Sequence, residues 1–281
     1  MKKGKLLWLA VIAALVLVPT MAWAQAKAPK APALSEPSYF VELYAGGGGI
    51  PSTGDMIKSM RTDALPAGRR INASLPGNWD AYALGGLKFG YWFSPYGTYA
   101  IGNMPDWARY FGFYTDFSYH RFSLANQTGR YRVYDAAGAL AAANQVGADS
   151  SGNLVTWAFM FAGRYGFLPD SQLPFGRVEA YMAVGPAIFF SDQRLTAALV
   201  GTGFRLSPAT QSEVNVGLAV ETGARYFFNK AVSAQVSFKY RYFNPSYDFS
   251  GTIPGTANTF NLNAKTDIHL LSGQVGVAYH F

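Results

Sequence analysis

Nine ionisable side chains occupy positions that share one face with small residues. Around each of them Gly, Ala, Ser or Thr recur at every second position, and large apolar residues fill the positions between. A period of two is typical of a β-strand, whose successive side chains point to opposite faces. The expected neighbours on adjacent strands are Glu42 with Lys88 and Asp116, Arg164 with Glu179, and Glu221 with Lys239; Arg225 and Arg241 complete the set.

These charges are expected to pair with one another, because an enclosed charge without a partner costs several kcal/mol. Three roles stay open for them: structural filling, a gate whose rearrangement opens a small conductance, and the handling of protons or a ligand. We name them the internal charge network, which comprises Glu42, Lys88, Asp116, Arg164, Glu179, Glu221, Arg225, Lys239 and Arg241.

The three histidines offer little for catalysis or for metal binding. His120 and Ser123 are three residues apart, as are His269 and Ser272, so on a strand each pair divides between opposite faces. His280 has no hydroxyl partner in register. Cysteine is absent, which excludes disulfides and thiolate chemistry, and scattered histidines make a poor metal site. We expect no cofactor, no metal and no catalytic residue.

Eight alternating segments follow one another from residue 38 to residue 281. Their small faces suit the crowded interior of a narrow barrel, and their large apolar faces suit lipid. The sequence therefore predicts an all-β fold: an eight-stranded antiparallel up-and-down transmembrane β-barrel. The segments are 39–45, 79–93, 111–120, 155–167, 177–190, 214–228, 232–242 and 271–281.

Composition agrees with an apolar environment. Only 14% of the residues are charged, against about 25% in a soluble domain, and 16% are aromatic. Beyond residue 20 no apolar run reaches the roughly 20 residues of a spanning helix. The formal charge is +7, and removing Lys2, Lys3 and Lys5 leaves +4 with no dense basic patch, so nucleic acid is not an expected partner.

The first 24 residues are typical of a cleaved secretory signal. Lys2, Lys3 and Lys5 precede an apolar stretch, and small residues at Ala22 and Ala24 predict cleavage between Ala24 and Gln25. Residues 25–37 are rich in Ala, Pro and Lys and lack periodicity, which predicts a flexible periplasmic leader. The barrel is expected to begin at residue 38.

Connections of alternating length set the expected orientation. Long polar connections at 50–78, 124–152, 191–212 and 244–266 predict four external loops, and shorter ones at 94–108, 169–175 and 229–231 predict periplasmic turns. Stretches of the long loops, such as Arg130 to Tyr134, still alternate, so some strands are expected to continue past the membrane, and ten strands remain an alternative to eight. We also expect a bulge at Pro186, which lacks a backbone donor inside a strand.

Basic residues in the expected external loops suit anionic lipid phosphates. The possible lipopolysaccharide contacts are Lys58, Arg61, Arg69, Arg70, Arg130 and Arg132, with Arg194 and Arg205 in the next loop.

The C-terminal segment carries a resemblance to a known group. Val275, Val277, Tyr279 and Phe281 alternate with small or polar residues up to the terminal aromatic ring. This ending resembles that of small outer-membrane β-barrels of the OmpA/OmpX type. The resemblance implies an outer-membrane location, a monomer, and recognition of Tyr279 and Phe281 by the barrel-assembly machinery. Larger members carry a peptidoglycan-binding domain, which we do not expect here because the chain ends at its last strand.

The histidine pairs can be compared with the catalytic residues of enzymes that share this barrel architecture. Lipid A deacylases use a His and a Ser two residues apart, and neither pair in this chain has that spacing. Outer-membrane proteases need several acids and a His, and Asp267 with His269 matches this requirement only weakly. We therefore expect a non-enzymatic outer-membrane protein with a role in envelope integrity and surface interaction. The alternatives are a narrow, porin-like channel for small solutes and, third, a lipid-modifying barrel enzyme.

Overall fold

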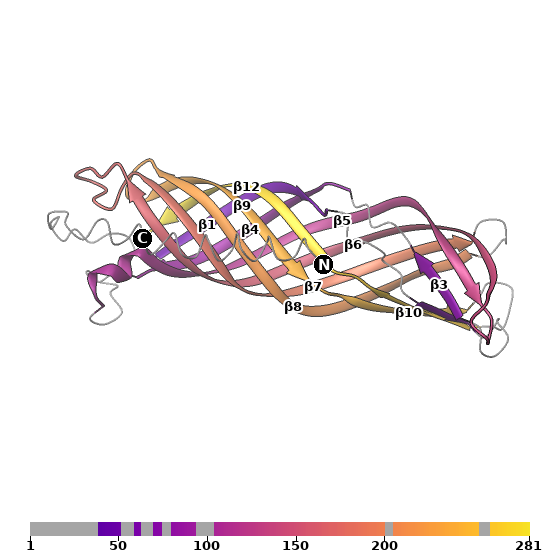
Figure 1. Ribbon diagram of the computed structural model, residues 1–281. Helices are drawn as coiled ribbons and strands as arrows, with labels where there is room; N and C mark the ends of the chain where they lie inside the picture. Colours follow the sequence, from indigo (N-terminus) through magenta and orange to yellow (C-terminus); the bar gives the residue numbers. More distant parts are fainter. Residues whose placement is uncertain are drawn as a thin grey trace.

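The computed structural model describes residues 39–51, 59–62, 70–74, 80–93, 104–199, 205–252 and 259–281, and within them it is built almost entirely of β-strands (Figure 1). One short 3-10 helix, η1 (Asp106–Tyr110), precedes β5. Among these residues no helix is long and apolar enough to cross a membrane. The strands are β1 (Tyr39–Gly49), β2 (Ser59–Thr62), β3 (Arg70–Ser74), β4 (Tyr82–Trp92), β5 (Phe111–Tyr134), β6 (Leu140–Phe167), β7 (Val178–Leu199), β8 (Arg205–Phe227), β9 (Val232–Phe243), β10 (Ser246–Thr252), β11 (Thr259–Lys265) and β12 (Ile268–His280).

Eight of these strands close into an antiparallel barrel. The order around the barrel is β1, β4, β5, β6, β7, β8, β9 and β12, and β12 pairs back onto β1. Closure leaves no strand of the barrel with an unpaired edge, so backbone N–H and C=O groups find hydrogen-bond partners on both sides, as a β-structure in hydrocarbon requires. The expectation of an eight-stranded antiparallel barrel is confirmed, and the ten-stranded alternative is wrong.

The strands are staggered as well as closed. Following paired residues once around the wall leads from Tyr39 through Tyr91 and Phe113 back to Gly49, which is ten residues further along β1. Stagger of this kind tilts the strands against the barrel axis, and eight tilted strands leave an interior just wide enough for side chains to fill. Inward side chains far apart in sequence are therefore brought into contact.

At one end the wall continues well past the barrel ring. Strands β5 to β8 are 22 to 28 residues long, and β3 pairs with the far part of β5 while β2, β11 and β10 follow in order (Figure 1). Much of the predicted external loops is therefore strand, because their polar residues alternate with apolar ones that pack inside. Tyr131 and Val133 are buried in this extension. Only Asp135–Ala139 separates β5 from β6.

The opposite end carries the short turns. η1 lies in the longest of them, and Leu168 and Gly176 have positive φ values of 57° and 139° in the turn between β6 and β7. Asp170 accepts hydrogen bonds from the backbone N–H of Leu173 and from the Arg177 guanidinium. These bonds, the backbone bond first, hold the pKa of Asp170 below its ordinary value of 3.8.

Pro186 does not produce the expected bulge. It is exposed on the outer face of β7, and the register with β6 is the same on both sides of it, since Val184 pairs with Phe161 and Ala187 with Ala158. The pairing omits only Gly185 and Pro186. Gly185 explains how the strands stay close, because a Cβ there would lie 1.8 Å from the carbonyl oxygen of Phe159.

Candidate functional site

The lumen of the barrel is the candidate site, and it holds all nine residues of the internal charge network. Each of these side chains is at most 7% exposed. The strands position them by alternation: along β9, for example, Ser237, Lys239 and Arg241 are buried while Phe238 is exposed. The protein therefore encloses its charges and presents its apolar side chains outward.

Two lysines and three acids form the centre of the network. Lys88 Nζ lies 2.7 Å from Glu42 Oε1 and 2.6 Å from Glu221 Oε1. Lys239 Nζ lies 2.7 Å from Glu221 Oε2 and also pairs with Asp116. The expected neighbours Glu42 with Lys88 and Glu221 with Lys239 are in contact. Asp116 is opposite Lys88 in register but pairs with Lys239 instead.

Tyrosine hydroxyls surround this centre. Tyr44 Oη donates to Asp116 Oδ1 at 2.5 Å, and Glu221 accepts from Tyr114 at 3.1 Å and from Tyr181 at 2.6 Å. Tyr44 thus bonds the Asp116 oxygen that Lys239 leaves open, and each Glu221 oxygen contacts one lysine and one tyrosine. Each tyrosine is two residues from a network acid in the sequence, as in Glu42 and Tyr44, but none was expected to take part in the network. Large rings among Gly and Ala were the signal that could have identified them.

Two arginines form a second layer toward the short turns. Arg225 Nη2 lies 3.0 Å from Glu42 Oε2, and Arg164 Nη1 lies 3.0 Å from Glu179 Oε1, as the expected pairing of these two strands required. Rings cover both guanidinium groups: Arg164 lies 4.5 Å from the Trp92 ring, and Arg225 lies 4.8 Å from that of Phe40. Gln235 joins the layers by donating to Glu42.

Arg241 departs from the expected ion pairing. Its Nη2 donates to Ser118 Oγ at 3.1 Å, and among the described residues no carboxylate pairs with it. Register gives the reason: two residues beyond Lys239 on β9, it lies between Ala219 of β8 and Leu270 of β12 rather than beside an acid. The network therefore holds five cations and four acids within the part of the chain described here.

An apolar layer lies in the lumen beyond Arg241. The rings of Phe189 and Phe243 stack with centroids 4.4 Å apart, and Tyr82 stacks on His120 at the same distance. Together with Leu154, which is 1% exposed, they fill the interior where the wall continues into the extension. The lumen is thus packed first by ion pairs and then by apolar side chains.

Two of the histidines lie on the opposite face from the serine three residues away, as expected. His120 is buried while Ser123 lies on the other face, and His269 and Ser272 are divided in the same way. The expectation that His280 lacks a hydroxyl partner is wrong, because its Nε2 lies 2.7 Å from Ser233 Oγ on the neighbouring strand. His120 and His280 are both buried, and within the described ranges no three His, Asp or Glu residues are grouped to hold a metal ion.

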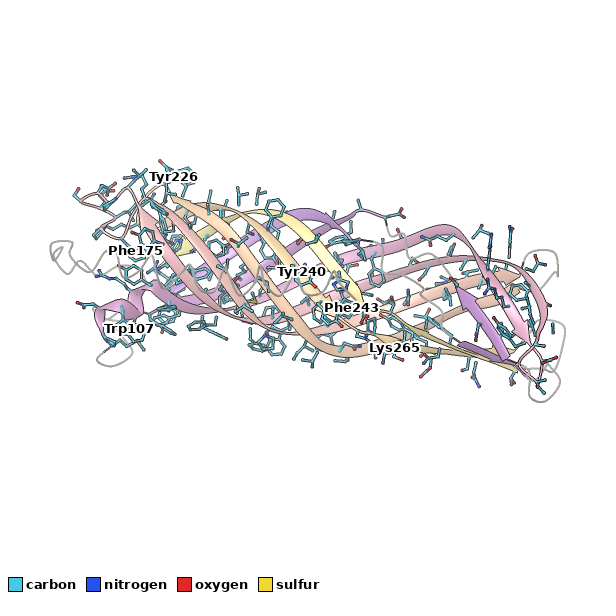
Figure 2. The ribbon with its side chains drawn as sticks, in the orientation of Figure 1. Trp107, Phe175, Tyr226, Tyr240, Phe243 and Lys265 are labelled. Atoms are coloured by element: carbon cyan, nitrogen blue, oxygen red, sulfur yellow. The ribbon has the colours of Figure 1, made fainter. Side chains whose placement is uncertain are left out.

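The outer face carries exposed rings at both ends of the barrel. Tyr226, Phe228, Tyr279 and Phe281 lie near the short turns and are 44% to 57% exposed. Trp107 of η1 joins them at this end (Figure 2), and Tyr119 and Phe190, 49% and 41% exposed, lie toward the extension. Between these levels the wall exposes aliphatic and aromatic side chains, among them Leu43, Val236, Phe238, Val275 and Val277.

The other predicted site residues lie outside the lumen. Arg130 and Arg132 are exposed on the outward face of β5 in the extension. Tyr279 and Phe281 face outward at the end of β12. The predicted cleavage site at Ala24 and Gln25 and the side chains of Lys58, Arg61, Arg69 and Arg70 lie outside the residues whose placement is described.

Solved structures of similar architecture come from the outer membranes of bacteria. The chain is similar to OprG. This outer membrane protein from Pseudomonas aeruginosa aligns at 13% identity and a TM-score of 0.41, over 88% of this chain and 98% of OprG.

Two further alignments cover 88% of this chain and 100% of the other: Neisserial surface protein A at 13% identity, and the attachment invasion locus protein Ail of Yersinia pestis at 12%, both with a TM-score of 0.36. No protein family and no curated protein matches the sequence.

Proposed function

We propose that the protein is a non-enzymatic β-barrel of the bacterial outer membrane that contributes to envelope integrity and contacts the cell's surroundings through its strand extension. One observation carries the proposal: polarity is inverted relative to a soluble protein. Glu42 and Glu221 are fully buried, whereas Leu43 and Phe238 are 69% and 68% exposed. Water would penalise this arrangement, and hydrocarbon outside a closed wall would favour it.

The internal charge network supports a sealed barrel rather than an open pore. Breaking a buried ion pair by removing one partner costs about 3–5 kcal/mol, so the salt bridges of Lys88 and Lys239 hold the wall together across the lumen. The stacked rings of Phe189 and Phe243 add a second obstruction. A barrel closed in this way is suited to structural and surface roles.

The alternative is a narrow channel for small solutes, and Arg241 is the observation that favours it. It is a cation without a carboxylate partner among the described residues, and it lies on the same face of β9 as Lys239. If Lys239 moved, Arg241 would offer Asp116 a second partner. The network could then rearrange without leaving the Asp116 carboxylate unpaired. Planar bilayer recordings distinguish the two functions, because the sealed barrel is expected to give no unitary current.

Detergent dependence tests the membrane location itself. The full chain is expected to stay monodisperse in detergent or lipid and to precipitate when detergent is removed. A monomer that stays in solution in detergent-free buffer contradicts the proposal.

Incubation with phospholipid or lipid A, followed by mass spectrometry of the lipid, tests the enzymatic alternative; deacylated products would support it.

A further inference from the structure

A hollow of about 670 Å³ lies on the outer wall of the barrel, where the wall continues into the extension. Strands β4 to β8 contribute its lining, which includes Tyr119, Arg121, Asn153, Asp192 and Arg194. Tyr119, Arg121 and Arg194 are exposed, and Asn153 and Asp192 are half-buried. These polar side chains face outward, while the buried side chains of Tyr82 and Phe122 contribute to the inner part of the lining.

Three rows of outward residues in register pass through this part of the wall. Successive rows are two residues apart along each strand, roughly 7 Å. From the barrel toward the extension, the rows are Tyr119, Val155, Phe190 and Val214; then Arg121, Asn153, Asp192 and Ser212; then Ser123, Ser151, Arg194 and Thr210. The first row is apolar and 41% to 62% exposed, and the other two are polar. The hollow thus lies at the outer edge of the apolar surface, where lipid headgroups begin.

Hydrogen bonds fix the orientation of the polar groups in the hollow. Tyr119 Oη donates to Asn153 Oδ1 at 2.8 Å, and Asn153 donates to both carboxylate oxygens of Asp192 at 2.8 and 3.0 Å. Ser123 Oγ donates to Asp80 Oδ2 at 2.8 Å. The Tyr119 ring is therefore held with about half of its surface exposed. These hydrogen-bonded side chains form the polar part of the lining.

The two arginines of the hollow remain free to bind. Within the part of the chain that the structure describes, neither Arg121 nor Arg194 has a hydrogen bond or an ion pair. Guanidinium groups bind phosphate through paired, charge-assisted hydrogen bonds. The carboxylates of Asp80 and Asp192 balance the charge of the two arginines, so the hollow is not expected to bind anions in general. It suits a ligand that offers both phosphate groups and neutral hydroxyl groups.

We propose that this hollow binds the headgroup of a phosphorylated glycolipid in the outer leaflet. The phosphates contact Arg121 and Arg194, and the sugar hydroxyls bond to Asn153 and Asp192. The sugar ring packs on the Tyr119 ring, while the acyl chains lie along the exposed first row of the hollow. The assignment rests on the proposed outer-membrane location, and it places lipid recognition on the barrel wall rather than in the loops.

Native mass spectrometry of the full chain in detergent micelles tests the assignment. The probes are purified diphosphoryl lipid A, lipid A without phosphates, phosphatidylglycerol and inorganic phosphate. Diphosphoryl lipid A is expected to bind at least about tenfold more tightly than the other two lipids, since only it supplies both kinds of contact. Inorganic phosphate at equal concentration should not displace it. Equal binding of phosphatidylglycerol, or displacement by phosphate, would overturn the proposal.

Two double variants locate the binding. Arg121→Ala/Arg194→Ala should weaken lipid A binding about 10-fold to 100-fold, since two charge-assisted contacts are lost. Lys230→Ala/Lys265→Ala removes two exposed cations outside the hollow and should change binding less than about twofold. Equal effects of the two variants, or no effect of the first, would overturn the site. A barrel that needs detergent yet binds no lipid A keeps its proposed location and loses only this site.

Discussion

Lys88 of β4 and Glu221 of β8 meet across the lumen, with Nζ and Oε1 2.6 Å apart. Four strand-to-strand steps separate β4 from β8 in either direction around the barrel, so this contact joins opposite sides of the wall. A single lysine thereby links Glu42 on the adjacent strand to Glu221 on the far side. The barrel is braced internally as well as along its circumference.

Removing this brace should destabilise the barrel. Lys88→Ala leaves Glu42 and Glu221 short of a cation in a dry interior, and the expected loss is about 3–5 kcal/mol in the free energy of unfolding. Urea titration of the protein in lipid vesicles measures it, and planar bilayers should show increased leak. Lys265→Ala, at an exposed position of β11, is the matched control and should unfold like the parent. Equal stability of Lys88→Ala and the control would contradict the brace.

The outward face should be intolerant of charge only where it meets hydrocarbon. Leu43 is 69% exposed on the barrel wall, and Leu43→Arg is expected to lose about 2–4 kcal/mol of stability in bilayers. Ala143 is exposed in the extension, and Ala143→Arg should change stability by less than about 0.5 kcal/mol. Similar costs at both positions would mean that the two surfaces face the same solvent.

Close contact between β6 and β7 makes Gly185 a sensitive position. A methyl group there would clash with the Phe159 carbonyl oxygen, which belongs to the backbone and cannot rotate away. Gly185→Ala should destabilise the barrel by about 1–3 kcal/mol through overpacking. A methyl group at Gly273 would meet no atom within 4 Å, so Gly273→Ala serves as the control and should have little effect. Thermal unfolding of the two variants in micelles makes the comparison.

The turn between β6 and β7 should contribute to stability in a pH-dependent way. Backbone and Arg177 hydrogen bonds lower the pKa of Asp170 in the folded protein. Its contribution is therefore present above the unfolded pKa, near 3.8, and is lost as the pH falls through the lower folded value. Asp170→Asn should flatten this part of the melting temperature curve between about pH 2 and pH 5. An unchanged curve would show that the turn adds nothing.

The C-terminal aromatic residues should matter for assembly more than for the finished fold. Tyr279 and Phe281 are 57% and 50% exposed and project outward from the end of β12, so neighbouring side chains cover only about half of each. Phe281→Ala is expected to lower the fraction of folded barrel in cell envelopes, measured by heat-dependent gel mobility. The same variant should refold into synthetic vesicles like the parent. Equal losses in both settings would assign Phe281 a structural role alone.

Sequence alternation was sufficient to predict the barrel, because a period of two fixes which side chains share a face. It also placed Glu42, Lys88 and Glu221 together in the interior. It could not predict that Lys88 reaches Glu221, since contacts across the lumen depend on the ten-residue stagger, which no local pattern records. For the same reason Arg241 was expected to pair with an acid and instead contacts Ser118.

The continuation of strands past the membrane was predicted, but its length was not, because polarity partly concealed it. Residues around Arg130 and Arg132 are hydrophilic enough to be interpreted as loop, but Tyr131 and Val133, which alternate with them, pack inside the continued wall. A strand that leaves the membrane exchanges lipid for water on its outer face while its inner face stays packed. Its outward residues therefore become polar without any break in the alternation.

The length of β6 has a consequence for what the cell presents to its surroundings. Its 28 residues correspond to roughly 90 Å of extended chain, whereas a membrane-crossing strand uses about 9–11 residues. In the proposed orientation the turn at Asp135–Ala139 lies at the end of the extension that is farthest from the lipid. Antibodies, phages or host tissue approaching the bacterium would reach that tip well before they reached the bilayer.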